Sequence, residues 1–355
     1  MTHPHPTASI PVPRILFVCN ADTHGAVSAL DVCHRLCDAL AAHGMQPMVL
    51  QQWPITPQVD PRPAARTQEY PYPVYCSRDV GSDATLLCLV EQPGLVITLG
   101  ADPIGLALPL LDAGLPCIAW FVNASSFQSL PRGTLDHRVG LAAATQALAA
   151  QLGVLTGAPV VPLLPPLSAQ EPCSGGGDAV LVASVRREDG IHRVLQMALA
   201  RPHVPFVAIA PVGQMDADPP LRNDVPPNVS VLHASRALHR PCSIAVLPAL
   251  TADLPWDMLA HCLCAQLPIL ASSEPLLEHA VGAAGLVVGT HQPLAAWLDA
   301  LDLMLQNASP SSVGDLVAQE RAHGLRLPAA LAAQQCAQLA AQYVRSGGQP
   351  VAKRL

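Results

Sequence analysis

Along residues 243–288, short apolar runs that are typical of buried strands alternate with segments whose apolar residues have helical spacing. Polar residues fall where each strand would end. The run 244–247 is short enough for a buried strand, and a proline ends it before a polar loop. A helix is expected at 256–265, a second buried strand at 267–271 and another helix from near Glu274. Strands that alternate with helices predict a parallel sheet, whose ligands bind beyond the carboxyl ends of its strands.

The same alternation extends over both halves of the chain. Buried strands are expected at 14–20, 47–52, 94–99, 117–122, 138–144 and 160–164, and then at 179–184, 206–211 and 229–234. Helices are expected around 30–40, within 105–113, and at 146–152, 190–199, 294–305 and 328–344. Residues 53–73 are rich in proline and are expected to cross the surface as an ordered excursion.

These patterns predict an α/β protein made of two doubly wound, Rossmann-like halves that face a central cleft. Proline and glycine without periodicity mark the clearest linker, just before the second series of strands begins. The last helix is long enough to cross back over the first half. The expected parts are a disordered tail at 1–13, an N-terminal domain at 14–165, a linker at 166–178, a C-terminal domain at 179–327 and a returning segment at 328–355.

Composition narrows the class of protein. Of the 355 residues, 50% are hydrophobic and only 13% are charged, which is typical of a well-buried globular chain. The net charge of −7 and the lack of any dense Lys/Arg run argue against a nucleic acid or an anionic membrane as partner. Every long apolar stretch is interrupted, and the N-terminus does not have the pattern of a signal peptide. A cytoplasmic protein without a transmembrane segment is therefore expected.

Cysteine and histidine spacing gives little support for a metal site. The chain has 11 cysteines, most of them inside apolar runs where they resemble small buried hydrophobes. Cys33 and Cys37 share a helix face with His34 between them, but no second ligand pair follows at a useful spacing. Reduced structural thiols and no bound metal are the expectation.

Three segments of the second half, taken in order, carry a resemblance to a known family. They are AVLVASVRREDGIHRVLQMA at 179–198, NVSVLHAS at 228–235 and AQLPILASSEPLLEHAVGAAGLVV at 265–288. This order resembles the nucleotide-sugar domain of retaining GT-B glycosyltransferases of the glycosyltransferase family 4 type. The first half is similar from RILFVCNADTHGAVS onward, so the resemblance covers roughly residues 14–306. It implies a GT-B fold, a nucleotide-sugar co-substrate and an acceptor.

The donor-site motif of that family is degenerate in this chain. Where the family has an Arg and a Lys that bind the donor diphosphate, this chain has Ser184 and Asp189. Where it has two glutamates that hold the donor sugar and the ribose, this chain has Asp253 and His261. Only Glu278 is retained, and it resembles the acid of the family's pre-helical segment. An Asp in place of Lys inverts the charge where a diphosphate must be neutralised.

Neighbouring side chains are candidates to replace the lost contacts. Arg186 and Arg187 lie in the altered loop and could bind a diphosphate, or could be an ordinary solvated pair. Asp253 is the candidate catalytic carboxylate on the donor side, and His261 could reach the ribose or could be a packed helix residue. The remaining donor-side candidates are Trp256, Ser273, Glu274 and Glu278, and the helix N-terminus near Glu274 is expected to supply positive potential.

The acceptor side has fewer candidates. His24, in the first loop, is the nearest ionisable group for a catalytic role there, although a loop histidine without a task is the alternative. Gly25 beside it and Asn123 at a later strand end complete this side. A single glycine does not make a dinucleotide fingerprint, so no nicotinamide site is expected.

The leading functional hypothesis is a glycosyltransferase that moves a sugar from a nucleotide donor to an unidentified acceptor, with the retention that the resemblance implies. Replacement of both cations and both glutamates favours a different class, a degenerate GT-B protein that binds a ligand or a protein partner without turnover. A third possibility, an epimerase on the same fold, has no dedicated motif here.

Overall fold

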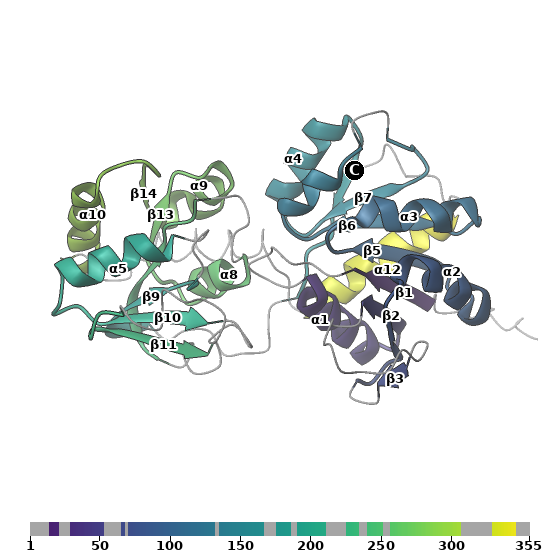
Figure 1. Cartoon of the computed structure of the whole chain (residues 1–355), viewed down its shortest axis with the longest axis horizontal. Coiled ribbons are helices and arrows are strands. Elements are labelled where there is room, and N and C mark those ends of the chain that lie inside the picture. Colours follow the sequence, from purple (N-terminus) through teal and green to yellow (C-terminus); the bar gives the residue numbers. More distant parts are fainter. Residues whose placement is uncertain are drawn as a thin grey trace, which may run out of the picture.

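The computed structural model describes residues 14–20, 29–52, 65–67, 70–131, 135–166, 175–185, 190–210, 225–233, 240–250, 256–306 and 329–345. Two α/β bodies lie side by side (Figure 1). We call residues 14–166 together with 329–345 the N-domain and residues 175–306 the C-domain. Each is built around one sheet with helices on both faces.

The N-domain sheet has eight strands in the order β3-β4-β2-β1-β5-β6-β7-β8. All its pairs are parallel except β3 with β4. The strands are β1 (Arg14–Cys19), β2 (Gln46–Gln52), β3 (Ala65–Thr67), β4 (Val74–Ser77), β5 (Leu95–Leu99), β6 (Cys117–Phe121), β7 (Gly140–Ala143) and β8 (Val160–Pro162).

Alternate residues of each N-domain strand supply two separate cores. On β1, Ile15 and Phe17 belong to the core beneath α1 (Ala29–Ala42) and α12 (Ala329–Arg345). Leu16 and Val18 belong to the core on the opposite face, beneath α2 (Val80–Glu91), α3 (Pro103–Asp112) and α4 (Gln146–Thr156). This two-sided burial explains why the strands read as continuous apolar runs.

The C-domain sheet has six parallel strands in the order β11-β10-β9-β12-β13-β14. They are β9 (Gly175–Val182), β10 (Phe206–Ala210), β11 (Val229–His233), β12 (Cys242–Leu247), β13 (Ile269–Ser272) and β14 (Gly285–Val288). One face is covered by α5 (Ile191–Ala200) and α10 (Leu294–Gln306), and the other by α8 (Trp256–Cys264) and α9 (Pro275–Val281), which the short η2 (Gly282–Ala284) follows. Both domains are therefore doubly wound, which confirms the expected fold class.

A hydrophobic cluster joins the two domains. Helix α4 of the N-domain packs against α9 of the C-domain. Leu148 and Ala149 from α4 share one buried cluster with Leu277, Ala280 and Val281 from α9. The two domains are thus in apolar contact through α4 and α9, and α9 follows the loop that leaves β13 of the C-domain sheet.

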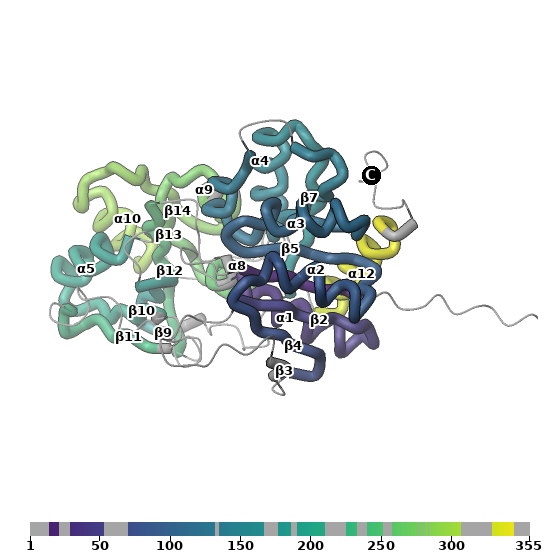
Figure 2. The backbone as a smooth tube through the Cα atoms, turned by 45° about the vertical axis from the view of Figure 1, so that its right-hand side comes forward, coloured from purple at the N-terminus to yellow at the C-terminus, as the bar shows by residue number. Residues whose placement is uncertain are grey.

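Helix α12 packs on the N-domain, far in sequence from the rest of it (Figures 1 and 2). Gln335 fixes the register, because its Oε1 accepts from Leu164 N at 3.0 Å and its Nε2 donates to Pro162 O at 2.7 Å. Tyr343 is buried over β7, where a Cβ added at Gly140 would overlap its hydroxyl oxygen. Gly140 therefore makes the room that Tyr343 occupies.

Two stretches differ from the sequence expectations. Residues 74–91, for which the sequence predicted no element, form β4 and α2. Leu86, Leu89 and Val90 of α2 are exposed while Ala84 and Cys88 are buried, so apolar residues surround the helix and hide its periodicity. Strand β9 begins at Gly175, inside the segment predicted as a linker, and Gly177 within it permits close approach to the carbonyl of Pro241.

We predict that Gly140→Ala destabilises the protein by about 1–3 kcal/mol, because its methyl group would collide with the buried ring of Tyr343. Chemical denaturation measures the change. Gly153→Ala is the matched control, since Gly153 lies in helix α4 and the nearest atom to its Cβ would be 3.6 Å away. It is expected to be neutral or to stabilise by about 0.5–1 kcal/mol. Equal effects of the two substitutions would contradict the packing argument.

Candidate functional site

Three loops meet at the carboxyl edge of the C-domain sheet. The strands β9, β12 and β13 are parallel, so the segments that follow them leave from the same edge. Gly190, with φ +81°, brings the segment after β9 so close to the one after β12 that a Cβ would overlap the carbonyl oxygen of Pro248. The buried Ser272 donates its hydroxyl to Ala249 O at 2.6 Å, which joins the end of β13 to the same segment. These two contacts therefore join the described ends of the three segments.

The turn between β13 and α9 carries two of the donor-side candidates. Ser273 N donates to Val288 O at 2.9 Å, and Ser273 Oγ accepts from Thr290 N at 3.1 Å. These bonds hold the turn against the end of β14. Glu274 occupies the N-cap of α9, and its carboxylate accepts from Leu277 N at 2.9 Å.

The position of Glu274 bears on one expectation about this site. The N-terminus of α9 was expected to supply positive potential for a donor phosphate. Instead, the carboxylate of Glu274 already receives one of the N–H groups there, and Pro275 at the first turn has no N–H to donate. The negative charge of the chain's own side chain thus sits where an anionic ligand was expected.

The other described donor-side candidates lie on α8 and α9. Glu278 is exposed on the first turn of α9, close in sequence to Glu274. His261 is only 4% exposed on α8, so its imidazole lies within the C-domain and matches the packed-helix alternative more closely than a ligand contact. Trp256 begins α8. His24, Gly25, Arg186, Arg187 and Asp253 lie outside the described residues, as does Asp189.

On the N-domain, Asn123 follows β6 and is 5% exposed. Its Oδ1 accepts from Ser125 Oγ at 2.9 Å and from Ser126 Oγ at 2.8 Å, and these bonds begin the 3-10 helix η1 (Ser125–Ser129). An asparagine used in this way shapes a turn. The structure therefore gives Asn123 a structural task, and its acceptor-side role stays a prediction.

Asn20, which the sequence did not single out, joins the loop after β1 to the loop after β5. It follows β1, and its Oδ1 accepts from Ala101 N at 2.8 Å. Gly100, with φ +110°, allows this approach, because a Cβ there would overlap the amide oxygen of Asn20. The signal in the sequence was an asparagine after one strand and a glycine after the next strand of the sheet, and neither is informative alone.

His34 belongs to a buried polar network. Its Nε2 lies 3.0 Å from Gln51 Oε1, and its Nδ1 lies 3.0 Å from Tyr72 Oη. The Tyr72 hydroxyl also donates to His34 O at 3.1 Å, and a neutral imidazole can donate from Nε2 to Gln51 Oε1. Burial lowers the pKa of His34 below its ordinary value, although the bond to Gln51 and two nearby acids oppose this. Both ring nitrogens are thus used within the fold.

The described residues also bear on metal binding and on membrane spans. Within them, no three His, Cys, Asp or Glu side chains gather closely enough to hold a metal ion. No helix in those ranges has the length and apolar character needed to cross a membrane.

Gly190→Ala is expected to destabilise the protein by several kcal/mol, because it combines a left-handed backbone with a collision at Pro248 O. Gly44→Ala is the matched control: Gly44 has φ +76°, yet its Cβ would meet nothing within 4 Å. The free energy of unfolding of that variant should fall only by what a left-handed backbone costs a residue with a side chain, about 1–2 kcal/mol. Denaturant unfolding of both variants measures the difference, and similar losses would show that the contact between the two loops is unimportant.

We also predict that His34 makes stability depend on pH. Unfolded His34 takes up a proton near pH 6.5, whereas the folded residue has a lower pKa. The unfolded state then binds more protons, so the unfolding free energy falls as the pH falls from about 7.5 to about 5. This fall should be smaller in His34→Gln and unchanged in His291→Gln, which removes an exposed histidine. An equal fall in all three proteins would contradict the assignment.

Comparison with known proteins adds information at the level of the fold. No family model matches the sequence, and no curated protein does. Sucrose-phosphate synthase from Thermosynechococcus elongatus is similar in structure, with a TM-score of 0.68 at 12% identity over 94% of this chain and 100% of that one. HepE of Anabaena, solved in complex with UDP and glucose, gives 0.68 at 14% identity over 93% and 100%. A glycosyltransferase from Rickettsia africae gives 0.66 at 10% identity over 94% and 99%. The chain has the GT-B fold that these glycosyltransferases share.

Proposed function

We propose that the protein is a glycosyltransferase that moves a sugar from a nucleotide-sugar donor to an acceptor. The observation that carries this proposal is the similarity over more than nine-tenths of the chain to GT-B glycosyltransferases, one of them solved with UDP and glucose. The similarity includes both sheets, so it extends to the donor half and the acceptor half of such an enzyme.

The chemistry of the transfer assigns the roles. The departing nucleoside diphosphate gains negative charge, and a water-poor site must neutralise it. Arg186 and Arg187 are the cations of the loop after β9, and their planar guanidinium groups suit phosphate oxygens. Asp253 would bond a hydroxyl of the donor sugar, and Glu278 would add a second carboxylate on α9. With two arginines at the diphosphate, no metal ion is needed to neutralise its charge. The resemblance to retaining enzymes implies that the transferred sugar keeps its anomeric configuration.

On the acceptor side we assign His24 as the group that exchanges a proton with the attacking hydroxyl. Its ordinary pKa lies close enough to neutrality for either direction of transfer. Gly25 would let the acceptor approach the backbone. Asn123 would contribute through the turn that it shapes.

One observation favours a second candidate function. Glu274 places its own carboxylate on the N-terminus of α9, and the buried Ser184 stands at the position of the family's arginine. Both features lower the affinity for a diphosphate. A GT-B protein that binds a partner or a ligand without turnover is therefore the alternative.

Calorimetric titration with UDP, ADP and GDP tests the proposed function. We expect the protein to bind at least one of these nucleotides, and the double variant Arg186→Ala/Arg187→Ala to bind it about 100-fold more weakly, since each charged hydrogen bond contributes about 1.5–3 kcal/mol. Arg14→Ala/Arg138→Ala removes the same charge from the N-domain and is the matched control. It should bind as the wild type does.

Failure of all three nucleotides to bind would overturn the transferase assignment and favour the binding protein. Equal weakening in both arginine double variants would show a general effect of charge and not a site. Chromatography that detects free sugar released from a bound nucleotide sugar then distinguishes turnover from binding alone.

A further inference from the structure

Helix α9 of the C-domain depends on its neighbours for its position. It has only seven residues, Pro275–Val281, and Glu274 caps it. Isolated helices shorter than about 12 residues are marginal in water, so tertiary packing decides where such a helix lies. Leu277, Ala280 and Val281 are buried, and they belong to a hydrophobic cluster that has members in both domains. The N-domain therefore takes part in placing α9.

The N-domain contributes the first turn of α4 to this cluster, and α4 packs against α9 (Figures 1 and 2). Leu148 is fully buried there, and Ala149 is 8% exposed. Leu152, one turn further along α4, is also fully buried, but it belongs to the core between α4 and the N-domain sheet. Two consecutive leucines of one helix face thus have different neighbours. Leu148 lies at the junction of the domains, and Leu152 lies within the N-domain.

The capping side chain of each helix binds the N–H group of the leucine that joins the shared cluster. Thr145 caps α4, and its Oγ1 accepts from Leu148 N at 3.1 Å. Glu274 caps α9, and its carboxylate accepts from Leu277 N at 2.9 Å. Helix α4 follows β7 and α9 follows β13, each a parallel strand of its sheet. The contact between α4 and α9 therefore begins where the carboxyl edges of the two sheets end.

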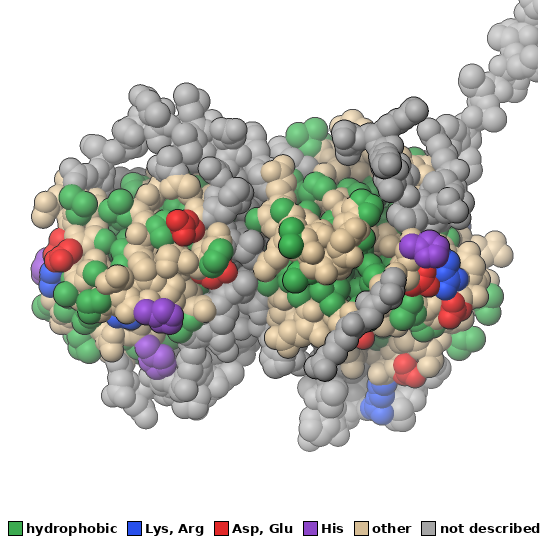
Figure 3. Space-filling view, turned by 90° about the horizontal axis from the view of Figure 1, so that it is seen from above, with side chains coloured by type: hydrophobic (Ala, Val, Ile, Leu, Met, Phe, Trp, Pro, Cys, Tyr) green, Lys and Arg blue, Asp and Glu red, His purple; other side chains and the backbone are tan. Residues whose placement is uncertain are grey.

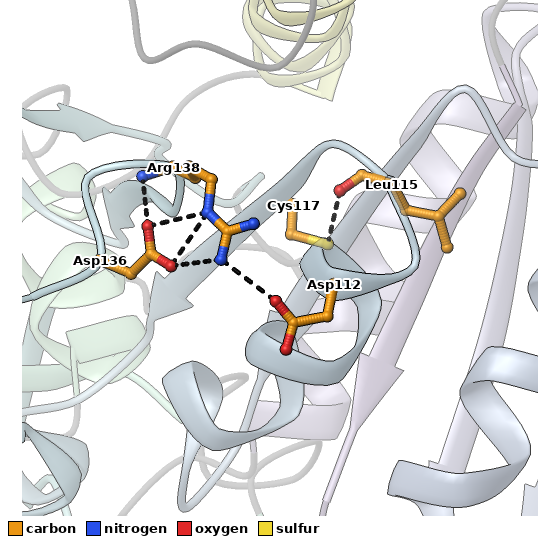
Figure 4. A network of polar contacts seen from close by, with 5 residues as sticks. All are labelled: Asp112, Leu115, Cys117, Asp136 and Arg138. Carbon is orange, nitrogen blue, oxygen red and sulfur yellow. Dashed lines mark hydrogen bonds and ion pairs between the residues drawn. The ribbon is translucent and has the colours of Figure 1, made fainter.

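Helix α4 belongs to the N-domain body, because the segments around β7 are tied to other N-domain elements. Before β7, Arg138 pairs with Asp136 at 2.7 Å and with Asp112, at the end of α3, at 3.1 Å (Figure 4). After β7, Ala144 N donates to Phe121 O of β6 at 2.9 Å. Helix α9 thus packs against a helix that its own domain does not supply.

The contact between the two helices is apolar. Helix α4 has no charged residue. Figure 3 looks onto the side of the molecule where α4 and α9 lie, and the charged side chains of the N-domain gather toward its outer end there. The strength of an apolar contact depends on how well the side chains fill the space between the helices, so a large-to-small substitution is the appropriate test.

We propose that Leu148 is a positioning residue for the donor site. Through the cluster that it shares with Leu277, it sets where α9 lies, and with α9 the carboxylate of Glu278. This inference rests on the proposed function, in which Glu278 contacts the donor sugar. A misplacement of about 1 Å can cost a catalytic or binding geometry about 100-fold, so a side chain of the N-domain controls how the C-domain holds its donor.

Hydrogen exchange of the unliganded full chain tests the positioning without a ligand. In Leu148→Ala, the amides of Leu277 and Gly282, which are hydrogen-bonded in α9, should exchange about 10-fold faster, because the helix loses packing. Leu152→Ala is the matched control: it makes the same truncation in the same helix and should leave these amides unchanged. Leu148→Met keeps the volume of the side chain and should restore slow exchange. Chemical denaturation checks that both alanine variants are folded and similarly destabilised.

Calorimetric titration with UDP-glucose, ADP-glucose and GDP-glucose tests the consequence for the donor. The wild type is expected to bind at least one of them, and Leu148→Ala to bind it about 10-fold more weakly, because the carboxylate of Glu278 is displaced. The nucleoside diphosphate alone should bind Leu148→Ala as it binds the wild type, since Arg186 and Arg187 hold it. A general loss of stability would not separate the two ligands in this way. Leu152→Ala should bind both as the wild type does.

Equal exchange of α9 in Leu148→Ala and Leu152→Ala would overturn the positioning by the N-domain. Faster exchange in Leu148→Ala with an unchanged affinity for the nucleotide sugar would overturn the link between α9 and the donor. A wild type that binds none of the nucleotide sugars would overturn the proposed function, while the exchange rates would still decide whether Leu148 holds α9.

Discussion

Close backbone contact at the carboxyl edge of the C-domain sheet is the constraint on which the candidate site depends. The absence of a side chain at Gly190 lets the segment after β9 lie against Pro248, and the hydroxyl of Ser272 holds the segment after β12 from the other side. A ligand bound beyond these strands would lie next to the backbone that these two contacts hold together. Such a scaffold limits the entropy lost on binding, whichever side chains the neighbouring loops present.

The position of Glu274 affects the two candidate functions differently, because its carboxylate opposes the binding of a phosphate at the N-terminus of α9. Its carboxylate accepts a hydrogen bond from the helix that it caps, so a phosphate at that position would have to displace it or bind elsewhere. Displacement would lose a cap and place two negative charges close together. A transferase on this scaffold must therefore obtain its positive charge from the loop after β9. A binding protein has no such requirement.

The sequence predicted the sheets well because parallel strands buried on both faces read as uninterrupted apolar runs, as in β5 and β6. It failed at α2, where exposed Leu86, Leu89 and Val90 remove the contrast between inner and outer faces. It also could not foresee the direction of the Glu274 side chain, because a glutamate beside a turn can point to a ligand or to its own helix. The sequence also did not indicate the contact between Asn20 and Gly100, because these two residues are 80 positions apart in the chain.

The return of α12 to the N-domain affects how the chain folds during synthesis. One face of the N-domain sheet is covered by α1 and by Ala332, Cys336, Leu339 and Tyr343 of α12. A ribosome makes the whole C-domain before it reaches these residues. The nascent N-domain therefore exposes part of an apolar face while the C-domain folds beside it, which makes the growing chain a client for chaperones that bind hydrophobic surface.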